Sequence, residues 1–83
     1  MSHDSNLVYV ANQIGKFFAH QPADKAVDSI VDHIFKYWDP RMRKAMAAHL
    51  DEHAGAGLDP RPLAAMQKVR DRDRQKQAAL AQH

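Results

Sequence analysis

The sequence predicts an all-α protein: a small bundle of three to four short helices with a polar, mobile C-terminal tail. Apolar residues recur at three- and four-residue spacing along most of the chain, which is the period of one helix face. An Asp-Pro pair occurs twice, at Asp39-Pro40 and at Asp59-Pro60, and this pair is typical of a helix N-cap followed by the first helical residue. No stretch alternates between apolar and polar residues as a half-buried strand does.

The first expected helix begins at Asp4 or Ser5 and runs to about His20. Pro22 follows it and disfavours helical backbone in the residue before it. Gly15 lies beside the apolar face and costs the helix about 0.5–1 kcal/mol relative to Ala, so we expect another helix to approach closely there. The apolar face consists of Leu7, Val10, Ala11, Ile14, Phe17 and Phe18.

The second expected helix is capped by Asp24 and ends at Tyr37 or Trp38. Its apolar residues cover about half of the helical wheel, whereas a helix with one neighbour needs a stripe only about 100° wide. The helix is therefore expected either to lie between two neighbours or to contact another protein as well. The apolar residues are Ala26, Val27, Ile30, Val31, Ile34, Phe35, Tyr37 and Trp38.

The third expected helix is capped by Asp39, begins at Pro40 and ends near Ala54, because Gly55 and Gly57 favour a C-terminal stop. Its apolar face is formed by Met42, Ala45, Met46 and Leu50, with His49 and His53 in the middle of the same face.

The first turn of this helix carries three cations, Arg41, Arg43 and Lys44. The helix dipole opposes cations at that end by about 0.3–1 kcal/mol each. Two interpretations stay open. An acidic partner surface or a bound anion could hold these side chains, or they could be solvated near Asp32 and Asp39.

A fourth helix is expected to begin at Pro60. Leu63, Met66 and Val69 continue the apolar period, which ends at Arg70. The sequence therefore predicts a helical domain over residues 1–69 and a polar, basic extension over 70–83. Beyond Arg70 we expect either a frayed helix or one that is ordered only on a partner.

Composition excludes several classes of function. The chain has no cysteine, which removes disulfides and thiolate ligands. From Lys68 to Lys76 five bases oppose two acids, a net charge of +3, while the remaining seven bases and eight acids give −1. This pattern does not resemble a nucleic-acid-binding face. No apolar run could cross a membrane, and no signal peptide is evident, so we expect a cytoplasmic protein.

One five-residue motif resembles a metal site. The segment from His49 to His53 matches the H-x-x-E-H pattern of inverted zinc proteases. A protease also needs a third ligand and a substrate cleft, which a chain of 83 residues does not readily supply. We therefore expect no metal site and no catalytic residue.

Several short segments together resemble a known family. They are Ala11-Asn12-Gln13-Ile14-Gly15-Lys16-Phe17-Phe18, His33-Ile34, Trp38-Asp39-Pro40-Arg41-Met42-Arg43 and Gly57-Leu58-Asp59-Pro60. Their order and spacing are similar to those of the delta subunit of NAD-dependent formate dehydrogenase. The resemblance covers residues from about 7 to 66.

This resemblance implies an accessory role in a cytosolic molybdenum or tungsten formate dehydrogenase complex. The alpha subunit of such a complex carries bis-molybdopterin guanine dinucleotide and Fe–S clusters, and the beta and gamma subunits pass electrons to FMN and NAD. The delta subunit itself binds no cofactor in the family pattern. It supports assembly or stability of the complex, or insertion of the cofactor into the alpha subunit.

Combining this resemblance with the helix patterns predicts a docking surface for the alpha subunit. The expected contact residues are Phe17, Tyr37, Trp38, Arg41, Arg43 and His49. A direct pterin phosphate site at Arg41, Arg43 and Lys44 is a further possibility. The alternative is a stand-alone helical binding or regulatory module with a basic tail.

Overall fold

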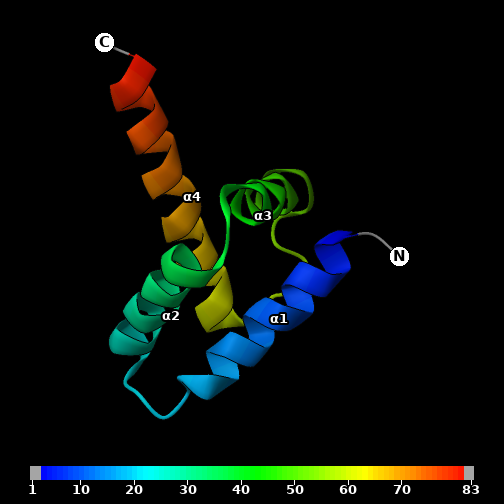
Figure 1. Cartoon of the computed structure of the whole chain (residues 1–83). Helices are drawn as coiled ribbons and strands as arrows, with labels where there is room; N and C mark the ends of the chain where they lie inside the picture. The colour runs from blue at the N-terminus through cyan, green and yellow to red at the C-terminus, as the bar shows by residue number, and fades with distance from the viewer. Residues whose placement is uncertain (1–2, 82–83) are drawn as a thin grey trace.

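The structure, a computed structural model, describes residues 3–81. These residues form four α-helices without any strand, which confirms the all-α prediction (Figure 1). No helix in this range is long and apolar enough to cross a membrane. The helices are α1 (His3–Phe17), α2 (Ala23–Tyr37), α3 (Pro40–His53) and α4 (Pro60–Ala81).

Helix α4 is the element on which the other three meet. It packs most extensively against α2, then against α3, and it also contacts α1. Figure 1 shows its second half extending beyond the other helices toward the C-terminus. One apolar core fills the space between the four helices, and its fully buried members include Ile30, Ile34 and Met66.

The wide apolar side of α2 is largely explained by the fold. The helix contacts both α4 and α1, so it has the two neighbours that the sequence allowed. Its buried residues are Ala26, Val27, Ile30, Val31 and Ile34. The predicted N-cap was wrong by two residues. Pro22 occupies the N-cap position with no side-chain cap bond, and Asp24 lies within the first turn.

Helix α1 ends earlier than the predicted His20. Its last residue is Phe17, and the backbone then turns. The guanidinium of Arg61 donates to the carbonyl oxygens of Ala19 and Gln21, at 3.2 Å and 3.0 Å. These bonds satisfy carbonyl groups of the α1–α2 turn, so tertiary contact with α4 holds this turn in place.

Both ends of α3 agree with the sequence. Asp39 is the N-cap, and its Oδ1 accepts a hydrogen bond from the Met42 N–H at 3.0 Å. At the other end the backbone becomes left-handed at Ala54, with φ of 55°, and Gly55 and Gly57 follow with φ of 71° and 89°. Glycine tolerates this conformation without a Cβ clash, so the predicted stop is confirmed.

We expect Asp39→Ala to lower the free energy of unfolding by about 1 kcal/mol, because the Met42 N–H loses its acceptor. Asp24→Ala is the matched control, since Asp24 lies near a helix start without capping it. Urea unfolding followed by circular dichroism measures both changes. Equal losses in the two variants would contradict a capping role for Asp39.

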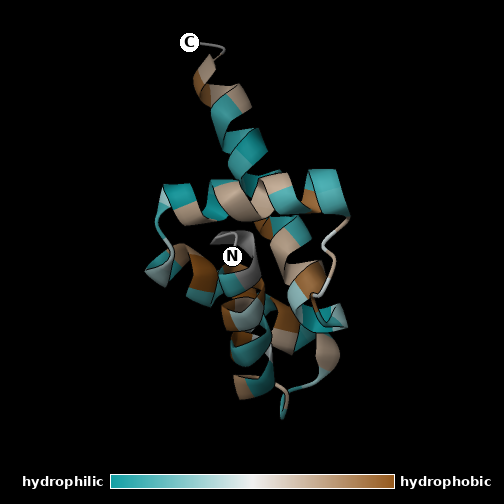
Figure 2. Ribbon diagram, turned by 90° about the vertical axis from the view of Figure 1, so that its right-hand side faces the viewer, coloured by the Kyte–Doolittle hydropathy of each residue, from teal (hydrophilic) through white to brown (hydrophobic). Residues whose placement is uncertain are grey.

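Helix α4 continues without a break through Arg70, where the apolar pattern ends. Val69 is the last buried residue, and the helix runs on to Ala81. Figure 2 shows this end as a mostly hydrophilic segment that projects from the bundle. The predicted division between residues 69 and 70 thus coincides with the end of burial and not with the end of the helix.

Candidate partner-binding surface

The six predicted contact residues fall into two groups. Phe17, Tyr37 and Arg41 are exposed, and the side chains of Phe17 and Tyr37 are 72% and 71% accessible. The other three predicted contact residues, Trp38, Arg43 and His49, are buried or half-buried. The structure therefore offers only the first group as a free surface.

Four rings form a continuous row that runs from the end of α1, through the first residue after it, to α2. We call this row the aromatic surface: Phe17, Phe18, His33 and Tyr37. Phe17 and Phe18 meet edge to face with ring centroids 5.0 Å apart. Phe18 meets His33 at 6.1 Å, and His33 meets Tyr37 at 4.6 Å. The row joins the end of α1 to the last two turns of α2.

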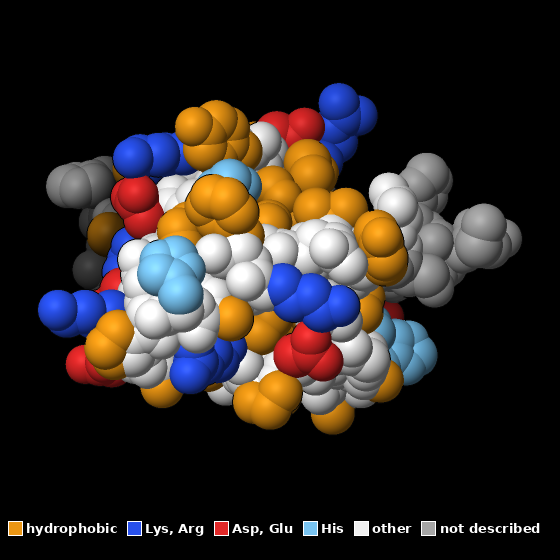
Figure 3. Space-filling model, turned by 90° about the horizontal axis from the view of Figure 1, so that it is seen from below, with side chains coloured by type: hydrophobic (Ala, Val, Ile, Leu, Met, Phe, Trp, Pro, Cys, Tyr) orange, Lys and Arg blue, Asp and Glu red, His pale blue; other side chains and the backbone are white. Residues whose placement is uncertain are grey.

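The aromatic surface borders a shallow hollow. Its volume is about 240 Å³. It is lined by Phe18, Ser29, Asp32, His33, Lys36 and Tyr37. Lys36 pairs with Asp32 at 3.1 Å, and this hydrogen bond and the carboxylate charge raise the pKa of Lys36 above its ordinary value. Figure 3 looks onto the end of the molecule that holds the α1–α2 turn, where hydrophobic side chains gather beside a histidine.

Trp38 lies inside the protein. It is the C-cap residue of α2, its side chain is 5% exposed, and it belongs to the common core. Tyr37 beside it points outward, as expected for neighbours about 100° apart on a helix. Of the two adjacent aromatic residues that were both expected to contact a partner, only Tyr37 is therefore exposed.

His49 is a core residue of α3. Its Nε2 lies 2.8 Å from the Ala56 carbonyl oxygen, which can only accept, so Nε2 donates. Its Nδ1 is buried and has no hydrogen-bond partner among the described residues. His53 is exposed, and the centroid of its ring lies 5.6 Å from the centroid of the His49 ring. Within residues that the structure describes, no three potential metal ligands gather around this pair.

The cations at the start of α3 do not share one environment. Arg43 donates to Asp73 on α4 and to the Trp38 carbonyl oxygen, both at 2.9 Å. Its guanidinium also lies over the Phe35 ring, 5.0 Å from the centroid. Arg43 therefore fits neither of the two interpretations that the sequence left open, because a carboxylate of the same chain, Asp73, holds it. Arg41 and Lys44 have no carboxylate within ion-pair distance in the described part of the chain.

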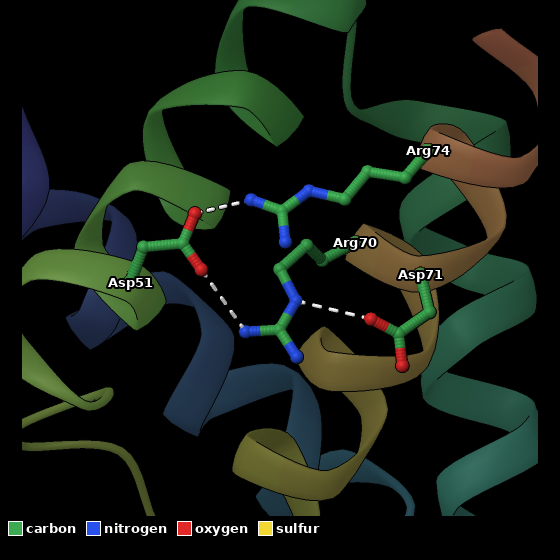
Figure 4. A network of polar contacts seen from close by, with 4 residues as sticks. All are labelled: Asp51, Arg70, Asp71 and Arg74. Carbon is green, nitrogen blue, oxygen red and sulfur yellow. Dashed lines mark hydrogen bonds and ion pairs between the residues drawn. The ribbon is translucent and has the colours of Figure 1, made fainter. Parts of the chain in front are cut away.

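A second ionic cluster connects α3 to the extension of α4. Asp51 accepts from Arg70 at 3.3 Å and also pairs with Arg74, while Arg70 contacts Asp71 at 3.1 Å (Figure 4). These contacts, with Arg43–Asp73, connect α4 beyond Val69 to α3. Part of the basic segment is therefore balanced within the chain.

Sequence reasoning did not single out His33 as part of this row. Phe18, expected on the apolar face of the first helix, is half-buried against the core and also contacts the His33 ring. One signal could have found this cluster: His33 and Tyr37 are four residues apart, a spacing that places side chains together on a helix. The contact with Phe18 depends on how α1 packs beside α2 and has no local signal.

A family model described as NADH-dependent formate dehydrogenase delta subunit (FdsD) matches residues 6–66. No curated protein and no solved structure matches the chain. The matched region contains the whole aromatic surface and ends within the first half of α4.

Proposed function

Because the chain belongs to the family of NADH-dependent formate dehydrogenase delta subunits, we propose that it is a non-catalytic accessory subunit that docks on the catalytic alpha subunit. The docking surface in this proposal is the aromatic surface. Phe17 and Tyr37 are its main contact residues in this proposal, because both expose most of a large side chain to water.

The exposure of these rings is the observation that supports docking. Burying one such side chain contributes about 1.5–3 kcal/mol, and aromatic residues are enriched among the residues that dominate binding. The packing of α1 and α2 leaves the side chains of Phe17 and Tyr37 exposed. Their neighbours in the chain differ, because Phe18 packs against the core and Trp38 lies within it. A protein partner that covers both rings would supply this missing burial.

In the proposed complex the cofactors belong to the other subunits. The chain has no cysteine and so cannot supply thiolates to Fe–S clusters. Bis-molybdopterin guanine dinucleotide and Fe–S clusters would lie in the alpha subunit, with FMN and NAD reached through the beta and gamma subunits. The chain would then support assembly, stability or cofactor insertion by contact with the alpha subunit.

A direct phosphate-binding role at the start of α3 receives less support. Arg43, one of its three predicted cations, is engaged by Asp73 and the Trp38 carbonyl oxygen. Arg41 and Lys44 remain exposed, but two surface cations at a helix start do not enclose an anion. We therefore base the proposed function on the aromatic surface alone.

Co-purification of the complex tests this proposal. With an affinity tag on this chain, we expect Phe17→Ala/Tyr37→Ala to reduce recovery of the alpha subunit about tenfold or more, which corresponds to about 1.4 kcal/mol of lost binding. Formate oxidation with NAD should fall in parallel. Tyr9→Ala is the matched control, because Tyr9 is also an exposed aromatic residue of α1, at 63%.

The possible outcomes distinguish the roles. Unchanged recovery of the alpha subunit with the double variant would exclude the aromatic surface as the docking site. Unchanged recovery with lost activity and lost molybdenum would assign these residues to cofactor insertion. If the wild-type chain does not co-purify with the alpha subunit, the docking proposal is wrong and a stand-alone helical module becomes the better interpretation.

A further inference from the structure

A groove separates α3 from the projecting end of α4. Its volume is about 520 Å³. We call it the α3–α4 groove and define it by Lys44, Ala47 and Ala48 on α3 and by Arg74, Lys76 and Leu80 on α4. Figure 1 shows the end of α4 extending past α3, so one wall of this groove stands away from the rest of the bundle.

The groove carries an excess of positive charge. Five cations line it against two carboxylates, Asp51 and Asp73, for a net charge of +3. Asp51 is already paired with Arg70 and Arg74, and Asp73 with Arg43. Lys44 and Lys76, one on each wall, have no ion-pair partner within the residues that the structure describes.

Between these cations the groove is lined by small and apolar side chains. Ala47 and Ala48 present only methyl groups, which allow another backbone to approach closely. Leu80, near the end of α4, is 67% exposed. The wall from Arg70 to Ala81 has twelve residues, or about 18 Å of helix at 1.5 Å per residue. A partner helix of about three turns matches this length.

We propose that the α3–α4 groove binds an acidic amphipathic helix of the partner subunit, an inference that rests on the proposed function. Glutamate or aspartate side chains of that helix would pair with Lys44 and Lys76. Its apolar face would cover Ala47, Ala48 and Leu80. Charge complementarity favours this occupant, because every carboxylate within the groove is already neutralised by the chain itself.

A second copy of the chain fits the groove less well. Its most acidic helix is α2, in which three aspartates oppose two lysines. Helix α4 of a second copy has six bases and two acids and would be repelled. The groove wall from Arg70 onward also lies beyond the residues that match the family, so this contact would be additional to one made by the matched region.

Zero-length carbodiimide cross-linking of the purified complex, read by mass spectrometry, tests the occupant. This reagent joins a lysine amine directly to a carboxylate. We expect Lys44 and Lys76 to link to aspartates or glutamates of the alpha subunit. We also expect Lys44→Glu/Lys76→Glu to reduce recovery of the alpha subunit about tenfold, while Lys25→Glu/Lys68→Glu, with the same change in charge outside the groove, leaves it unchanged.

Each result has one meaning. The inference is overturned if the wild-type chain recovers the alpha subunit but Lys44 and Lys76 form no links to it, and if Lys44→Glu/Lys76→Glu recovers as much alpha subunit as the wild type. This result leaves the proposed function intact. Links between two copies of this chain, detected by mixing isotope-labelled and unlabelled protein, also overturn the inference. Failure of the wild-type chain to recover the alpha subunit overturns both proposals. Fold integrity is checked by circular dichroism, and Glu at position 44 suits a helix N-terminus.

Discussion

Trp38→Ala is expected to lower the free energy of unfolding by about 3–5 kcal/mol, the usual cost of truncating a buried Trp. The side chain is 5% exposed and packs in the common core. A chain of this size has a total stability of about 4–12 kcal/mol. We therefore expect the variant to lose a large share of its stability and to unfold at a much lower urea concentration than the wild type, as measured by helicity at 222 nm.

Tyr37→Ala is the matched control for this experiment. Tyr37 precedes Trp38 in the chain but is 71% exposed, so its truncation should change stability by no more than about 0.5 kcal/mol. A Trp38→Ala variant as stable as Tyr37→Ala would contradict the burial of Trp38. Trp38→Phe should retain much of the packing and lose less stability than Trp38→Ala.

This difference decides how interface mutants are interpreted. If Trp38→Ala no longer co-purifies with the alpha subunit, the cause would be destabilisation of this chain and not the loss of a contact with the partner. Phe17→Ala and Tyr37→Ala remove exposed rings instead and leave the core intact. They are therefore the variants that test docking.

Gly15→Ala is expected to destabilise the protein by about 1–2 kcal/mol. A Cβ at position 15 would lie 2.5 Å from Cγ and 3.0 Å from Cδ of Pro62. Relieving this overlap separates α1 from α4, and overpacking of this kind costs about 1–3 kcal/mol. The gain of about 0.5–1 kcal/mol from placing Ala in a helix only partly offsets the loss.

A double-mutant cycle with Pro62→Ala isolates this contact. Without the proline ring, the close Cγ and Cδ atoms are gone and the nearest remaining contact is Cβ at 3.9 Å. In that background Gly15→Ala should become neutral or stabilising by about 0.5–1 kcal/mol. The same loss in both backgrounds, measured by urea unfolding, would show that Pro62 is not the obstacle.

The sequence by itself determined the helical elements and several of their ends. Asp39-Pro40 placed the start of α3, and Gly55 and Gly57 placed its stop, because capping and left-handed backbone depend on neighbouring residues. Gly15 indicated a close helix approach, which Pro62 supplies. The family match over residues 6–66 agrees with the resemblance seen in the short motifs.

The tertiary structure alone decided which of the candidate contact residues are accessible. Helix periodicity separates Tyr37 from Trp38 by direction, but only the packing of α2 against its neighbours shows that Trp38 is the buried one. It likewise assigned Asp73, thirty residues away in the chain, as the partner of Arg43. Such pairs depend on distant segments meeting in space, and no local pattern encodes them.

The end of α4 shows the same division. Local apolar periodicity stops at Arg70, which correctly locates the end of burial. The sequence around it does not show that Asp51 pairs with Arg70 and Arg74, or that α3 and α4 leave a basic groove between them. Burial follows from side-chain pattern along one helix, whereas a groove requires the relative position of two.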